Sequence, residues 1–389
     1  MKETSGPIPV PIVCPVQETV RESPDLAAQL EPLLAYLCTN QAPENDQSFP
    51  RGTITSDGRL DLCKQDIGPA GAKLVTEALA QNTFVRHLLM GTNGIGDEGA
   101  AHLASLLEQN TALQTIYLGC NYIQTAGMAA LTGALRENTT VEGLWLKRNA
   151  LHAPGVAQLT DLLRHNRALR VVDLVNTNLG AEGFRSFMKV LIETNRTVER
   201  IYLGGNQLGE REAPYLAELL TQNKQIVSLQ LNVNHLGDKG ACILAEALSS
   251  NETLQELGLA SNGIASTGAI ALLQALQHHP ALRVLDLGYS PSTQVLGAAA
   301  NQLDDEVARE LAAFLRTNQQ IHSLNLVRHQ FTESGFQHLL NGLEHNASLQ
   351  HLQLDGNPPE PIKEWLRTRQ RPSASNPNSL VTAIRSVYR

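Results

Sequence analysis

The sequence predicts an α/β solenoid in which parallel strands line one face of a curved sheet and helices cover the other face. Three observations carry this prediction. A short motif recurs every 28 residues, apolar positions alternate within it, and an apolar pattern of helical spacing separates consecutive copies. A fixed period of 20 to 50 residues is typical of solenoids, in which each repeat packs mainly on its two neighbours.

The repeated motif is Leu-x-Leu-x-x-Asn, and it stands out most clearly at residues 88–93. Further copies occupy residues 116–121, 144–149, 201–206, 229–234, 257–262 and 352–357. Weaker copies begin at Leu60, Val172, Leu285 and Leu324, and they place Gln65, Thr177, Ser290 and His329 at the Asn position. We therefore expect about eleven parallel strands, and a 28-residue period lies in the leucine-rich-repeat range.

Each copy of the motif has the alternation of a strand with one buried face. In the copy that follows Thr115, Ile116 and Leu118 are expected to point into the solenoid, whereas Tyr117 points out. Asn121 is expected to turn inward, where its amide can pair with backbone groups of adjacent turns. Leaving such buried groups unpaired costs about 1–3 kcal/mol each, which explains an Asn at one position in so many repeats.

The second half of each repeat has apolar residues at helical spacing, as in residues 96–107. Asp97 is expected to be the N-cap of that helix, and Asn110 stands where the helix must stop. Small residues near the helix starts, such as Gly127 and Gly268, allow close packing against the neighbouring turn. Equivalent helices are expected through residues 131–135, 159–163, 244–248 and 311–315.

The combined pattern, Leu-x-Leu-x-x-Asn-x-Ile-Gly-Asp-x-Gly-Ala followed by Leu-Ala-x-x-Leu, resembles the ribonuclease-inhibitor-type leucine-rich repeat over residues 57–358. Similar repeats occur in the sensor regions of NOD-like receptors and in Ran GTPase-activating proteins. The resemblance implies a horseshoe with strands on the concave face and helices on the convex face. Ribonuclease inhibitors are rich in cysteine and alternate two repeat types, whereas this chain has five Cys and one repeat type, so inhibition of ribonucleases is not implied.

The remaining segments define the expected domain organisation. Residues 1–22 are a Pro-rich leader, and residues 23–56 hold a Leu-rich stretch that caps the first repeat or, alternatively, binds a partner. The solenoid of residues 57–358 carries an inserted loop at 291–300. In residues 359–389, Ile362, Trp365 and Leu366 are expected to cap the last repeat, followed by a basic, solvated tail for which contact with an acidic partner is the alternative.

Composition limits the classes of partner. The net charge of -8 argues against general affinity for nucleic acid, which requires basic surface. No run of 18 apolar residues is present, so no membrane span is expected. The odd number of cysteines, without a Cys-x-x-Cys pair, is typical of a reduced protein. We expect a cytoplasmic monomer, and an effector secreted into a host cell would share these features.

No motif with a known chemistry is found. Walker, His-Glu-x-x-His and Gly-x-Ser-x-Gly motifs are missing, and the histidines are too scattered to suggest a metal site. No catalytic residue, cofactor or metal is therefore expected. One enzymatic alternative follows from the resemblance, a GTPase regulator of the Ran GTPase-activating type that would use Lys147, Arg148 and Asn149. The expected ladder role of Asn149 and the basic tail both argue against it.

The outward strand positions give the main candidate site. Tyr117, Trp145, Asp173 and Tyr202 occupy equivalent positions on consecutive strands, which should place them along about 15 Å of one lane. The residues expected to flank this lane are Lys147, Arg148, Asn176 and Arg200. Trp, Tyr and Arg are enriched at interface hot spots, and an exposed aromatic cluster usually marks a contact site. The alternative is that the rings pack on one another and rigidify the sheet.

A second candidate patch, Asp286, Tyr289 and Arg328, lies beside the inserted loop. Long loops on rigid scaffolds often carry function, although insertions are also tolerated at little cost. The sequence thus predicts a non-enzymatic scaffold that binds a protein partner through its concave sheet. A GTPase regulator and a bacterial effector of the same fold remain as alternatives.

Overall fold

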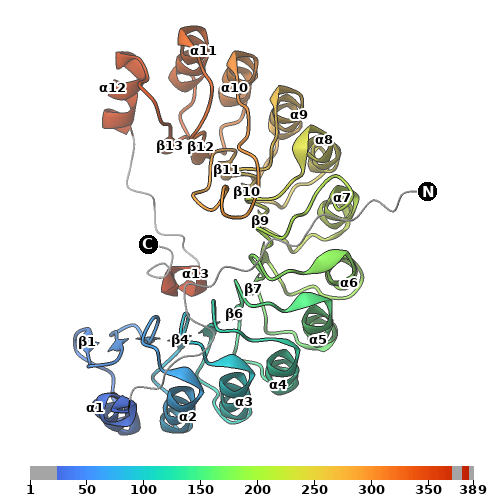
Figure 1. Ribbon diagram of the computed structural model, residues 1–389. Coiled ribbons are helices and arrows are strands. Elements are labelled where there is room, and N and C mark those ends of the chain that lie inside the picture. The colour runs from blue at the N-terminus through green and yellow to red at the C-terminus, as the bar shows by residue number, and fades with distance from the viewer. Residues whose placement is uncertain (1–23, 370–378, 385–389) are drawn as a thin grey trace. The chain divides into compact units, whose positions relative to one another are not determined.

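The computed structural model describes residues 24–369 and 379–384 (Figure 1). The expected leader of residues 1–22 and most of the expected tail, residues 370–378 and 385–389, lie outside the described residues. The chain divides into two compact units. Unit 1 comprises Met1–Thr197 together with Asn376–Arg389, and unit 2 comprises Val198–Ser375.

Unit 1 begins with a capping segment. Helix α1 (Leu26–Thr39) packs on α2, and the Asn82 side chain donates to the Leu37 carbonyl at 2.8 Å. Strands β1 (Gln47–Ser48) and β2 (Thr53–Ile54) pair antiparallel, and β2 pairs antiparallel with β3. The repeats then supply β3 (Arg59–Asp61), α2 (Gly68–Leu79), β4 (His87–Leu89), α3 (Gly96–Leu107), β5 (Thr115–Tyr117), α4 (Thr125–Leu135), β6 (Gly143–Trp145), α5 (His152–His165), β7 (Val171–Asp173) and α6 (Gly180–Glu193). The short helix α13 (Ser379–Ala383) also belongs to this unit.

Unit 2 continues the same alternation. Its elements are β8 (Arg200–Tyr202), α7 (Ala213–Gln222), β9 (Ser228–Gln230), α8 (Gly237–Leu248), β10 (Glu256–Gly258), α9 (Ser266–Leu276), β11 (Val284–Asp286), α10 (Asp305–Thr317), β12 (Ser323–Asn325), α11 (Glu333–Glu344), β13 (His351–Gln353) and α12 (Glu360–Arg369). Ile362 and Trp365 of α12 are buried, and Leu366 is half-buried. Across the described residues, β3–β7 and β8–β13 are the eleven strands that the repeat predicts, and each unit folds as a leucine-rich-repeat solenoid.

The 28-residue period sets the pairing of the strands. Leu88 pairs with Ile116, and Ile116 pairs with Leu144, so equivalent residues of successive repeats face one another. The inward positions Leu88, Ile116 and Leu118 are fully buried between sheet and helices. We call the sheet face turned away from the helices the concave face of each unit.

The Asn ladder has the predicted geometry. The Oδ1 atom of Asn121 accepts from the Asn93 backbone N–H at 3.0 Å. The Nδ2 atom of Asn121 donates to the carbonyl of Met90 at 2.9 Å and to that of Leu118 at 3.0 Å. One side chain thus joins two repeats through backbone groups that are buried from water, and the prediction of an inward Asn is confirmed.

A second Asn series closes the other side of most repeats, and His279 takes the equivalent place in one of them. Asn110, at the end of α3, donates from Nδ2 to the carbonyls of Leu79 and Asn82 in the preceding repeat, both at 2.9 Å. Its Oδ1 accepts from the backbone N–H groups of Ala112 and Leu113. The position of this Asn at the helix end was expected, but its role as a link between repeats appears only in the structure.

Two local predictions are wrong. Asp97 does not cap α3; its Oδ1 accepts from the Gln124 backbone N–H of the next repeat at 2.7 Å. Ser290 does not take the ladder position after β11. Asn301 takes it, accepting from the backbone N–H groups of Asn262 at 2.9 Å and Ile264 at 3.1 Å. The insertion therefore lies between the strand and its ladder Asn, which a fixed 28-residue count cannot reveal.

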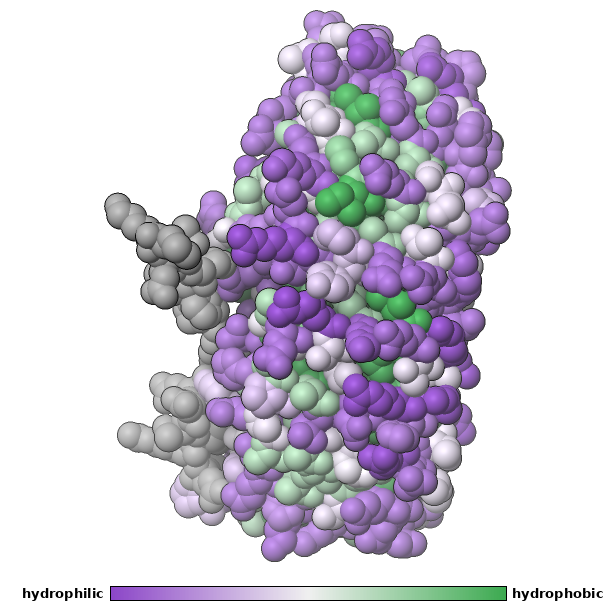
Figure 2. Space-filling model, turned by 90° about the vertical axis from the view of Figure 1, so that its right-hand side faces the viewer, coloured by the Kyte–Doolittle hydropathy of each residue, from purple (hydrophilic) through white to green (hydrophobic). Residues whose placement is uncertain are grey.

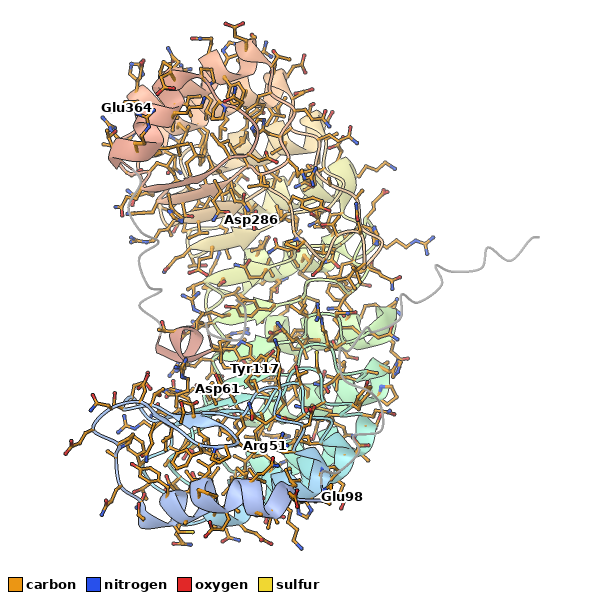
Figure 3. The ribbon with its side chains drawn as sticks, turned by 60° about the vertical axis from the view of Figure 1, so that its left-hand side comes forward. Arg51, Asp61, Glu98, Tyr117, Asp286 and Glu364 are labelled. Atoms are coloured by element: carbon orange, nitrogen blue, oxygen red, sulfur yellow. The ribbon has the colours of Figure 1, made fainter. Side chains whose placement is uncertain are left out.

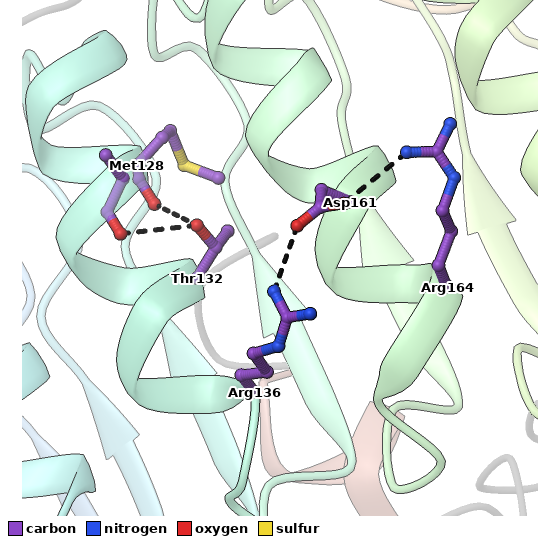
Figure 4. A network of polar contacts seen from close by, with 6 residues as sticks. Met128, Thr132, Arg136, Asp161 and Arg164 are labelled. Atoms are coloured by element: carbon purple, nitrogen blue, oxygen red, sulfur yellow. Dashed lines mark hydrogen bonds and ion pairs between the residues drawn. The ribbon is translucent and has the colours of Figure 1, made fainter.

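The helix side of the molecule is mainly polar. Figure 2 shows hydrophilic residues over most of this side, with hydrophobic residues scattered among them. Arg136, which follows α4, and Arg164 of α5 both contact the carboxylate of Asp161, at 3.1 and 3.4 Å (Figure 4). These side chains are about half exposed, so the pairs add little to stability.

Candidate functional site

Leu89, Tyr117 and Trp145 form a lane of large apolar side chains on the concave face of unit 1. Leu89 pairs with Tyr117 and Tyr117 pairs with Trp145, so the three residues stand at the same position of β4, β5 and β6. Asp173 continues the lane on β7. The structure therefore places Tyr117, Trp145 and Asp173 side by side as expected, and Tyr117 is labelled on this face in Figure 3. We call Leu89, Tyr117 and Trp145 the apolar lane.

The prediction that this aromatic cluster is exposed is wrong. Tyr117 is 2% exposed, and Leu89 and Trp145 are 0% exposed. At the equivalent positions of unit 2, Tyr202, Gln230, Asp286 and Asn325 are partly exposed, Gln353 is exposed and Gly258 is buried. Most outward side chains of unit 2 thus reach water, whereas those of Leu89, Tyr117 and Trp145 in unit 1 do not.

The C-terminal segment lies on the same side of unit 1 as the lane. Helix α13 lies on the concave side of unit 1, near β4 and β6, in both Figure 1 and Figure 3. Its residues Leu380, Ala383 and Ile384 are 5, 6 and 2% exposed. A solvated tail was expected from the sequence, and for these residues that expectation is wrong, because their apolar side chains are withdrawn from water.

The side-chain rings of Trp145 and Tyr117 lie directly over glycine residues of the sheet. A Cβ atom on Gly143 would come within 2.3 Å of the Trp145 ring, and one on Gly91 within 2.1 Å of the Tyr117 ring. Trp145 therefore folds back over the residue two positions before it, whereas Tyr117 covers Gly91 and Gly119. The two rings thus lie over different glycines.

The indole N–H of Trp145 does not make a hydrogen bond. Its Nε1 atom is buried and has no hydrogen-bond partner, in contrast to the ladder amides nearby. A buried donor without an acceptor costs about 1–3 kcal/mol. A binding partner that places an acceptor beside Trp145 Nε1 would therefore gain a hydrogen bond there.

Polar residues border the lane. The Lys147 ammonium lies 6.0 Å from the centroid of the Tyr117 ring. Burial lowers the pKa of Lys147, and Asp173 opposes that shift. Burial also raises the pKa of Tyr117, so its hydroxyl stays protonated. These contacts bring Lys147 and Asp173 to the lane as predicted.

The other two unit 1 candidates lie at the strand ends. Arg148 is half-buried with a left-handed backbone (φ 57°), and its N–H donates to the Val175 carbonyl at 2.9 Å. Asn176 is 4% exposed, and its Nδ2 atom has no partner. Arg148 can still reach solvent beside the lane, whereas Asn176 is part of the packed turn.

Arg200 and Tyr202, the remaining residues of the first prediction, belong to unit 2. Arg200 is 7% exposed, and its Nη1 atom lies 2.8 Å from a carboxylate oxygen of Glu256. The Ser228 hydroxyl donates to the same oxygen at 2.9 Å. Arg200 therefore joins β8, β9 and β10 across the sheet, which is a structural role, while Tyr202 stays partly exposed.

The second predicted patch is partly assembled in unit 2. The Arg328 guanidinium lies 5.0 Å from the centroid of the Tyr289 ring, so these two residues are in contact. Arg328 also lines a surface cavity of about 680 Å³ beside the inserted loop, together with Phe331 and Asp355. His329 stacks on Phe331 with ring centroids 4.4 Å apart. The cavity depends on the loop's path, and no sequence signal indicated it.

Asp286 has an unusual titration. Burial raises its pKa to about 6, although the Gly288 backbone N–H and the Asn325 side chain, which bond to it, oppose the shift. The raised pKa favours the protonated form in the folded state. The stabilisation that Asp286 contributes through its raised pKa is therefore fully present below about pH 4. It is lost as the pH rises through about 6, where the carboxyl ionises in the folded protein.

We predict that Asp286→Asn removes this pH dependence. The variant should be more stable than the parent above pH 6, by on the order of 2 kcal/mol, because no carboxylate has to be ionised in a buried place. Urea unfolding of both proteins between pH 4 and pH 7 measures the difference. A constant difference across that range would contradict the assignment.

No group of three or more His, Cys, Asp or Glu side chains suited to a metal ion occurs in residues 24–369 and 379–384. Within the same part of the chain, no helix has both the length and the apolar character needed to cross a lipid bilayer.

Comparison with known proteins agrees with the repeat architecture. The family model described as leucine-rich repeat matches residues 81–104 and 250–273. None of the curated proteins matches the chain. Among solved structures, the leucine-rich repeat-containing protein LegL7 from Legionella pneumophila is similar at 16% identity, over 79% of this chain and 88% of that chain, with a TM-score of 0.45.

A structure of leiomodin-1 actin-binding site 2 is similar at 20% identity, over 37% of this chain and 77% of that chain, with a TM-score of 0.32. Both structural similarities are too low to support any inference about function. The matched segments lie in two different repeats, and each runs from just after one helix through the following strand and most of the next helix. Together with the 28-residue period and the two Asn series, they agree with a leucine-rich-repeat solenoid fold.

Proposed function

We propose that this chain is a non-enzymatic recognition scaffold that binds an apolar segment of a protein partner on the concave face of unit 1. The observation that carries the proposal is the apolar lane. Leu89, Tyr117 and Trp145 are large apolar residues at three successive outward positions, although the interior of the solenoid is already filled by the inward positions. Outward positions do not pack in that interior, so large apolar side chains there favour a contact with another segment of protein.

The residue types also favour protein recognition. Tyr and Trp dominate interface hot spots when they are rigidly held, and both rings here rest on a glycine floor that fixes their positions. Lys147 and Arg148 beside the lane can supply the polar rim of an interface. The same positions of unit 2 carry Gln230, Gly258 and Asn325, so a comparable apolar surface is a property of unit 1.

The alternative of a GTPase regulator gains no support. Asn149, the central residue of that hypothesis, is 0% exposed. Its Oδ1 accepts from the backbone N–H groups of Asn121 and Ile123, both at 3.0 Å, and its Nδ2 donates to Leu118 and Leu146. A side chain with all its hydrogen-bonding groups engaged in the ladder cannot contact a substrate.

We predict that replacing Tyr117 or Trp145 by Ala weakens binding of the partner by about tenfold or more, the effect of removing a hot-spot aromatic. The partner is isolated with the full chain as bait, purified, and its Kd is measured by calorimetry. Tyr215→Ala is the matched control, because Tyr215 is an exposed aromatic on helix α7 of unit 2, and it should change Kd by less than about twofold.

Circular dichroism and urea unfolding establish that each variant is folded at the temperature of the binding measurement. Unchanged affinity in folded Tyr117→Ala and Trp145→Ala proteins would refute the proposed site. Loss of affinity in Tyr215→Ala instead would place the site on the helix side.

A further inference from the structure

We infer that residues 379–384 are an intramolecular ligand of the apolar lane, and that the external partner is a protein segment of the same kind: a short amphipathic helix that must displace them. This inference rests on the proposed function and adds to it the class of partner and the way in which access to the site is controlled.

The first support is the pattern of burial in the C-terminal segment. Leu380, Ala383 and Ile384 are buried, whereas Val381 and Thr382 between them are half-buried. The buried residues are spaced i, i+3 and i+4, so they lie on one side of the helical turn. Helices that dock into grooves of partner proteins present apolar anchors at this spacing.

The second support is the match between this segment and the surface that it covers. The apolar lane presents Leu89, Tyr117 and Trp145 on three adjacent strands, and all three are almost completely buried. Helix α13 lies on this face and is assigned to the same compact unit (Figures 1 and 3). Withdrawal of an apolar helix face and an apolar sheet face from water is the driving force for docking the one on the other.

The third support is that the fit is incomplete. Helix α13 has five residues, and the Nε1 atom of Trp145 is left buried without an acceptor. A short segment that leaves a donor unpaired is a weak ligand, but its covalent attachment gives it a high effective concentration at the site. A partner helix that offers an acceptor to Trp145 Nε1 gains an interaction that the intramolecular segment does not make.

The fluorescence of Trp145 tests whether residues 379–384 occupy the apolar lane. The chain has two tryptophans, so Trp365→Phe leaves Trp145 as the only one. In this background, Leu380→Asp combined with Ile384→Asp should release the segment. We expect a red shift of the Trp145 emission and about a threefold or larger rise in its quenching by acrylamide, because the indole gains access to water. Val381→Asp combined with Thr382→Asp is the matched control, since it adds the same two charges to the same segment at half-buried positions.

The docking itself is tested in trans. A fluorescein-labelled synthetic peptide of residues 376–389 should bind the full-length Leu380→Asp/Ile384→Asp protein about tenfold or more tightly than the parent, whose site is occupied. Adding Trp145→Ala to the released protein should abolish this binding. Unchanged emission and quenching in the double variant, or equal peptide binding by both proteins, would overturn the inference.

The partner measurement separates this inference from the proposed function. The released protein should bind the external partner about tenfold more tightly than the parent, because no segment has to be displaced. If release leaves the partner's Kd unchanged while Trp145→Ala still weakens it, the inference is wrong and the proposed function stands. If Trp145→Ala has no effect on the partner's Kd, the proposed function is wrong even when the emission shows that the segment covers the lane.

Discussion

Replacing Asn301 by Ala is expected to lower the free energy of unfolding by about 3–5 kcal/mol. The Asn301 side chain accepts from two backbone N–H groups, those of Asn262 and Ile264. It donates to the carbonyls of Leu259 and Leu287 at 2.9 and 2.8 Å. Truncation therefore leaves four backbone groups without their partner in a region that is closed to water. Urea unfolding followed by circular dichroism measures the loss.

Ser290→Ala is the matched control for Asn301→Ala. Ser290 stands 28 residues after Asn262, where a strict period places the ladder residue, but its side chain only accepts from the Ser292 backbone N–H at 3.3 Å. We expect its replacement to change stability by less than about 1 kcal/mol. Equal losses in the two variants would show that the ladder does not shift to Asn301.

The second large effect is expected at the Arg200–Glu256 pair. Glu256→Leu should lower the free energy of unfolding by about 3 kcal/mol, because it leaves the buried Arg200 guanidinium without its carboxylate. The two side chains are 8% and 19% exposed, so water replaces the lost partner only in part. The Ser228 hydroxyl loses its acceptor as well.

A double-mutant cycle isolates this interaction. The protein with both Arg200→Leu and Glu256→Leu should be more stable than the Glu256→Leu protein, since no unpaired charge then remains in the sheet. Chemical unfolding of the parent, both single variants and the double variant gives the coupling energy. If the losses of unfolding free energy in the two single variants add up to the loss in the double variant, the interaction between Arg200 and Glu256 contributes nothing to stability.

The sequence carried enough information for the repeat architecture. Each repeat packs on its immediate neighbours, so the contacts that fix a strand lie about one period away and leave a local, repeated signature. Asn121 is an example, because its partners in the preceding repeat can be inferred from the spacing alone. The outward direction of Tyr117 and Trp145 was predictable for the same reason, since side chains alternate along a strand.

The errors have a common physical cause. Asp97 was assigned to its own helix, but its carboxylate accepts from the next repeat, and composition does not distinguish a local cap from a contact between repeats. The shift from Ser290 to Asn301 depends on how an inserted loop leaves the strand. Arg200 was placed in a binding lane, although its partner Glu256 lies two strands away. In each case the deciding contact is made in three dimensions and does not repeat along the chain.

The sequence by itself determined the period, the direction of each side chain along the strands, and the presence of aromatic residues on the concave face of unit 1. Only the tertiary structure decided whether those aromatics meet water. Leu380 and Ile384 come from the far end of the chain, and a segment that folds back on a distant face leaves no period or spacing to detect. Whether a side chain is buried depends on all the segments that pack around it in the folded protein. The apolar lane is therefore buried in the structure, although the sequence predicts that it is exposed.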